Sequence, residues 1–135
     1  FMALLMIARR VSQLPFASVI AMIGASSFMF VPFVGIKDPF LPIIYLVMGG
    51  VLDILYYTFK NPANRLAVLS LIGGLAYMII PISRIGIYVF TGVLDRSFIK
   101  SGFIIPILSH FAFGVAGALL GAGLIFSIKK IRNKK

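Results

Sequence analysis

The chain has 135 residues, of which 61% are hydrophobic, and it contains thirteen lysines and arginines, three aspartates and no glutamate, tryptophan or cysteine. A composition this apolar is typical of an integral membrane protein, and the length corresponds to one domain. The absence of cysteine excludes disulfides and thiol chemistry, and the basic residues cluster at the ends of apolar runs without interleaved aromatic residues, which argues against nucleic-acid binding.

The chain starts with an apolar stretch, residues 1–7, that is followed by Arg9 and Arg10. We expect an interfacial segment or the end of a helix, with both arginines at the level of the lipid headgroups. Because the first residue is Phe, the sequence leaves open a preceding helix.

The first full span is predicted at about residues 14–34, which carry no charge. Ala17, Ala21 and Ala25 recur every four residues and form a smooth stripe on one helix face. Such a stripe is typical either of packing within the chain or of a docking face for another subunit.

The second span is predicted at 41–59 and contains Asp53 within its apolar run. A carboxylate inside a membrane costs a few kcal/mol on insertion scales, so it should face the bundle interior or a wet cavity and have a partner. Asp53 is thus either a structural hydrogen-bonding group or a residue that contacts a solute or an ion.

The third span is predicted at 66–83, and residues 85–94 either extend it or form a short separate helix. A helix broken within 81–94 is favoured, since Pro81 interrupts the run and the polar residues step by three and four along one face. This face consists of Ser70, Gly74, Tyr77, Pro81, Arg84 and Tyr88 and carries nearly every polar group of the segment.

The last span is predicted at 103–128 and precedes a basic tail at 129–135. Gly114, Gly117 and Gly121 share one face and predict close packing against another helix. The tail and the basic 60–65 loop place the C-terminus in the cytoplasm by the positive-inside rule. We therefore expect a bundle of at least four transmembrane helices, or five or six if 85–94 forms a separate helix.

The inventory of reactive side chains predicts binding rather than catalysis. There is one histidine, no metal-ligand set, no phosphate-binding loop and no nucleophile with an adjacent base, so no cofactor is expected. From their positions along the predicted spans, several polar side chains are expected to face one outward-opening cavity. Such a cavity would suit a small solute with an anionic or hydrogen-bonding group. Its candidate solute-binding residues are Asp53, Tyr77, Arg84, Tyr88 and His110.

Three segments resemble the substrate-binding S component of energy-coupling factor (ECF) transporters: ASVIA at 17–21, GGVLDILY at 49–56 and HFAFGVAGALLG at 110–121. The resemblance implies that Ala17 and Ala21 face a membrane coupling subunit, that two cytoplasmic ATPases power release, and that the solute sits toward the outer face. The family usually has six helices and a longer chain.

These observations predict a solute-binding subunit of an ATP-driven importer in a bacterial or archaeal cell membrane, in contact with lipid and other membrane subunits. The alternative is an accessory or scaffold subunit of a larger membrane complex. In that case the small-residue stripes are assembly surfaces, and Asp53, Arg84 and His110 are structural.

Overall fold

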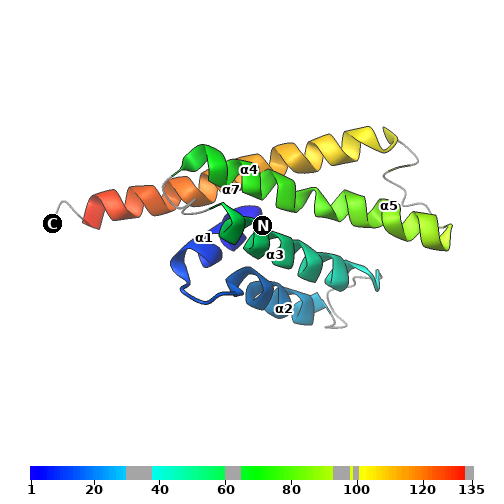
Figure 1. The fold of residues 1–135 in the computed structure, drawn as a ribbon, viewed down its shortest axis with the longest axis horizontal. Coiled ribbons are helices and arrows are strands. Elements are labelled where there is room, and N and C mark those ends of the chain that lie inside the picture. The colour runs from blue at the N-terminus through cyan, green and yellow to red at the C-terminus, as the bar shows by residue number, and fades with distance from the viewer. Residues whose placement is uncertain (30–37, 60–64, 93–97, 99–100, 133–135) are drawn as a thin grey trace.

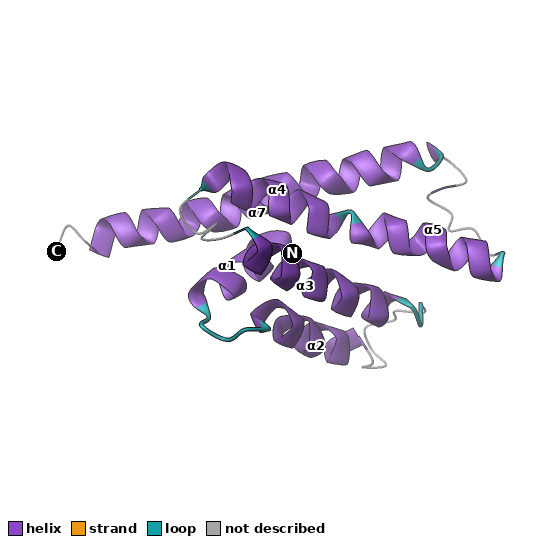
Figure 2. Cartoon of the chain, in the orientation of Figure 1, coloured by secondary structure: helices purple, strands orange, loops and turns teal. Residues whose placement is uncertain are grey.

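The structure is a computed structural model that describes residues 1–29, 38–59, 65–92, 98 and 101–132. Its helices are α1 (Met2–Val11), α2 (Ala17–Met29), α3 (Leu41–Thr58), α4 (Leu66–Tyr77), α5 (Ile79–Thr91) and α7 (Ile104–Arg132). Figure 2 shows no strand among these residues. The prediction of an all-α chain is therefore confirmed.

Helix α1 lies between two pairs of helices, α2 with α3 and α4 with α7, and it contacts both α2 and α7 (Figure 1). Helices α1 and α7 end, and α4 begins, toward one end of the bundle (Figure 1). We call it the basic end, because Arg9 and Arg10 form the last turn of α1 and Arg65 precedes α4. At the opposite end, α3 and α7 begin and α5 ends.

Three helical stretches are long and apolar enough to cross a membrane: Leu41–Thr58, Leu66–Thr91 and Ile104–Ile128. They support the prediction of an integral membrane protein. A fourth span at 14–34 is not confirmed, because α2 has 13 described residues, about 20 Å of helix, whereas a hydrocarbon core is about 30 Å thick. Residues 30–34 lie outside the described residues.

The break in the third span lies at Met78, between α4 and α5, and not within 81–94 as predicted. Its physical cause is Pro81, which has no N–H to donate to the carbonyl of Tyr77 and whose ring crowds that carbonyl. The helix then continues through Arg84 to Thr91 and ends at Gly92, whose φ of 70° is in the left-handed region. Residues 85–91 therefore extend the span, while 93 and 94 lie outside the described residues.

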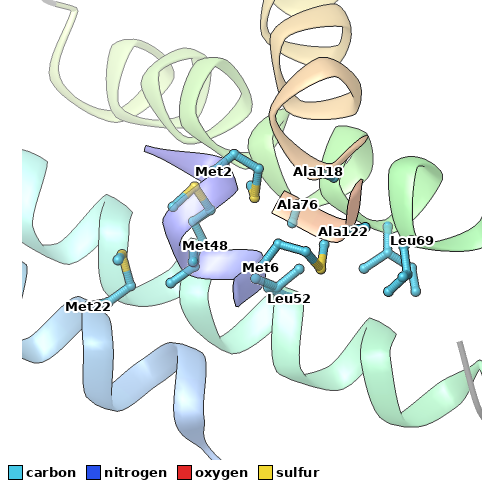
Figure 3. Packing of buried hydrophobic residues seen from close by; sticks show 11 residues of the cluster. Met2, Met6, Met22, Met48, Leu52, Leu69, Ala76, Ala118 and Ala122 are labelled. Carbon is cyan, nitrogen blue, oxygen red and sulfur yellow. The ribbon is translucent and has the colours of Figure 1, made fainter. Parts of the chain in front are cut away.

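Of the two alternatives predicted for the start of the chain, the end of a helix fits the structure: Arg9 and Arg10 form the last turn of α1, and one face of this helix is buried. Met2, Leu5 and Met6 are at most 3% exposed. Figure 3 shows the methionines of α1 among side chains of α3, α4 and α7, including Leu52 and Ala118. Flexible thioether side chains fill the irregular space where four helices meet. From α5, the partly buried side chains of Ile79 and Ile80 pack against this cluster of buried hydrophobic residues.

The three glycines predicted to pack on one face of α7 lie against two different helices. A Cβ atom at Gly114 would lie 2.6 Å from a backbone carbonyl oxygen of α4, and one at Gly121 would lie 2.5 Å from a carbonyl oxygen of α1. A Cβ at Gly117 would lie 2.9 Å from a Cβ of α1. The missing side chains thus allow α7 to approach both helices at backbone distance.

Candidate functional site

Asp53 is at the centre of a buried polar cluster near the basic end. Its carboxylate is 1% exposed and accepts hydrogen bonds from the backbone N–H groups of Ser18, at 3.1 Å, and Val19, also at 3.1 Å. These are amides of the first turn of α2, which have no partner within their own helix. Asp53 on α3 therefore caps α2 from outside, where the helix dipole favours a negative charge.

Arg9 neutralises this carboxylate and ties α1 to it. Its Nε lies 3.5 Å from Asp53 Oδ1, and the side chain is 5% exposed. The guanidinium also donates to the carbonyl oxygen of Leu14, at 2.6 Å, and to the hydroxyl of Tyr57, at 3.2 Å. It lies 4.7 Å from the ring centroid of Tyr56 and 5.0 Å from that of Tyr57. The buried carboxylate thus draws the guanidinium of Arg9 into the bundle. The headgroup level expected for the two arginines stays a prediction.

Sequence reasoning missed Arg9 as the partner of Asp53. The sequence did offer a signal. An ionisable group inside a membrane is usually paired, and Arg9 at the end of an apolar segment is a possible partner for Asp53. The same contacts explain why α2 begins at Ala17 and not at Leu14. The carbonyls of Leu14 and Pro15 turn toward Arg9, so residues 12–16 form a loop.

A second polar cluster lies on the other side of the core, toward the opposite end. The rings of Tyr77 and His110 stand with their centroids 5.4 Å apart, and Tyr45 lies close enough to Tyr77 and Arg84 to interact with both electrostatically. Arg84 forms an ion pair with Asp38, just before α3. We call these five residues the tyrosine–arginine cluster.

The structure brings three of the predicted solute-binding residues, Tyr77, Arg84 and His110, into this one cluster. It separates the other two. Asp53 belongs to the cluster with Arg9, and Tyr88 pairs with Phe103, at 6.3 Å between ring centroids.

Sequence reasoning missed two members of the tyrosine–arginine cluster. Asp38 lies before the start of α3, so no helical periodicity relates it to Arg84. Tyr45 shares a helix face with Asp53, but eight residues separate the two, about 12 Å along the axis.

The tyrosine–arginine cluster is half-buried and contains several hydrogen-bonding groups. The side chains of Arg84 and Asp38 are 19% and 28% exposed, and among residues of α5 only Pro81 is buried. His110 Nδ1 lies 2.8 Å from the carbonyl oxygen of Pro106. Because a carbonyl oxygen only accepts, Nδ1 is the donor in this contact, and Nε2 is the other ring nitrogen.

The alanines of the predicted docking stripe on α2 pack within the chain, and two of them also line a groove. Ala17 is buried, and Ala21 and Ala25 pack against the hydrophobic core. Ala17 and Ala21 also line an apolar groove of about 400 Å³ between α1 and α2. The exposed face of this helix is formed by other residues, including Ile20 and Ile23, each 52% exposed.

No group of three or more histidine, aspartate or glutamate side chains that could hold a metal ion occurs within the described ranges. Comparison with known proteins gives no match: no family model, no curated protein and no solved structure matches the chain.

Proposed function

We propose that the chain is the solute-binding subunit of a membrane importer, and that the solute site is the tyrosine–arginine cluster. The observation that carries the proposal is the position of this cluster. It lies at the edge of the hydrophobic core: Tyr45 and Tyr77 pack against the core, whereas the side chains of Arg84 and Asp38 are 19% and 28% exposed. Polar and ionisable side chains that converge at the edge of an apolar core within a membrane bundle are typical of a site that binds a solute.

The chemistry of the cluster suits a small solute that carries an anionic or hydrogen-bond-accepting group. The Arg84 guanidinium can bind a carboxylate or phosphate with two parallel hydrogen bonds. The hydroxyls of Tyr45 and Tyr77 can donate or accept, and both rings provide apolar walls. An anionic solute would replace Asp38 as the partner of Arg84, so the existing ion pair holds the guanidinium ready for that exchange.

The resemblance to ECF S components, together with the groove between α1 and α2, supports docking on a membrane coupling subunit that acts with ATPases. Ala21 lies in this groove and Ile20 beside it is half-exposed. With the basic end in the cytoplasm, as the positive-inside rule favours, the tyrosine–arginine cluster would face outward.

A scaffold subunit is the second candidate function. It is favoured because the two charged residues that the sequence assigned to the site already have partners within the chain. Asp53 pairs with Arg9, and Arg84 pairs with Asp38. The two functions differ in one measurable respect, which is a bound small molecule.

The proposal is tested by matched tyrosine variants of the full chain, purified in a mild detergent. We expect native mass spectrometry to find one small molecule bound per chain. Tyr77→Phe should weaken its binding about five- to tenfold, since one hydrogen bond contributes about 1 kcal/mol. Tyr88→Phe removes the same hydroxyl from a residue outside the cluster and should leave binding unchanged. A purified chain without any stoichiometric small molecule, or equal effects of both variants, would favour the scaffold.

A further inference from the structure

A groove of about 710 Å³ lies at the basic end, between the last turn of α1 and the C-terminal part of α7. It is separate from both polar clusters described above. Its apolar wall comes from both helices and includes Ile7, Val11, Leu124 and Ile128, and its polar rim consists of Arg10 and Gln13.

The apolar wall of the groove is exposed. Val11 is 68% exposed, Leu124 55% and Ile128 64%. These side chains follow one another along a groove between two helices, at the level where the bundle ends. A hydrocarbon chain would cover them, and each buried CH₂ group contributes about 0.8 kcal/mol.

The rim of the groove is positively charged. The guanidinium of Arg10 lies over the ring of Phe126, with its carbon 4.2 Å from the ring centroid, which fixes it at the mouth. Burial lowers the pKa of Arg10 from its ordinary value, yet a guanidinium remains charged at neutral pH. The described residues that line the groove include no acidic one, and in the sequence Ile128 is followed directly by Lys129 and Lys130.

We infer that this groove is a binding site for one anionic phospholipid. The phosphate contacts Arg10 and Gln13, and an acyl chain covers the apolar wall between α1 and α7. Charge complementarity selects this occupant over a zwitterionic lipid, because a basic pocket at a helix end binds a net negative headgroup. The site rests on different residues from the proposed solute site and does not depend on it.

The test measures lipid retention by the full chain. The protein is purified in detergent, mixed with equal amounts of phosphatidylglycerol and phosphatidylcholine, and examined by native mass spectrometry. We expect one tightly held phosphatidylglycerol per chain. Arg10→Gln should weaken this binding about fivefold, the effect of about 1 kcal/mol for one basic residue at a membrane surface. Arg65→Gln, which removes an exposed positive charge at the same end but outside the groove, should leave it unchanged.

A second variant separates loss of the site from loss of the fold. Val11→Trp keeps every charge and fills the groove, so it should weaken phosphatidylglycerol binding at least as much as Arg10→Gln. Equal retention of the two lipids, or unchanged retention in a folded Arg10→Gln or Val11→Trp chain, would overturn the inference. A protein subunit found in the groove in place of the lipid would overturn it as well.

Discussion

Replacing Asp53 with asparagine is expected to lower the free energy of unfolding by about 3–5 kcal/mol, because it leaves the charge of Arg9 buried without a counter-ion. The substitution also weakens the cap of α2, since a neutral amide oxygen accepts the Ser18 and Val19 amides less strongly than a carboxylate. The measurement is reversible unfolding of the purified chain in mixed detergent micelles, followed by circular dichroism.

Two comparisons control this prediction. Asp38→Asn breaks a half-exposed ion pair and should cost about 1 kcal/mol or less. In an Arg9→Met background, Asp53→Asn should cost clearly less than in the native chain, because no buried guanidinium is left unpaired. If the costs of Arg9→Met and Asp53→Asn simply add, the two residues do not form the pair that the structure shows.

Gly114→Ala is expected to destabilise the chain by about 1–3 kcal/mol through overpacking between α4 and α7. The new Cβ would lie 2.6 Å from the carbonyl oxygen of Gly73, 2.7 Å from the Cβ of Tyr77 and 2.9 Å from the Cα of Gly74. Because two of these atoms belong to the backbone, the helices must move apart to make room. The same unfolding measurement detects this cost.

Gly123→Ala is the matched control for that prediction. It adds the same methyl group to the same helix, but no atom lies within 4 Å of the added Cβ. It should stabilise the chain by about 0.5–1 kcal/mol, because alanine is more favourable than glycine inside a helix. Equal effects at both positions would mean that the α4–α7 contact is looser than the structure indicates.

The sequence predicts those features of the fold that depend on local pattern. Apolar length identifies the three long helices, and Pro81 predicts a break in the third span. The break lies at Met78, because a proline leaves the carbonyl four residues before it, here that of Tyr77, without a donor. Spacing places Gly114, Gly117 and Gly121 on one face of α7. Spacing cannot show that this face meets two helices, because that depends on where α1 enters the bundle.

The features that the sequence does not predict depend on long-range contacts. An apolar segment followed by arginines is equally consistent with a headgroup position and with a buried helix. Only the presence of Asp53 on α3 makes burial of Arg9 favourable. In the same way, the tyrosine–arginine cluster includes Asp38 and Tyr45. They come close to Arg84 and Tyr77 because α3 packs against α4 and α5, and no sequence pattern predicts this contact.

A solute site at the tyrosine–arginine cluster must open to water and not to lipid. Cysteine labelling can measure this, because the chain has no native cysteine. His110→Cys and Leu108→Cys are compared in liposomes with a membrane-impermeant maleimide. Leu108 is 61% exposed and nearer the start of α7, but its surroundings would be lipid, where a thiolate does not form readily.

We predict that the thiol at position 110 reacts readily although it lies deeper along α7, and that the thiol at position 108 does not. Labelling at 108 alone, or no labelling at either position in the folded protein, would contradict a water-filled solute site beside Arg84.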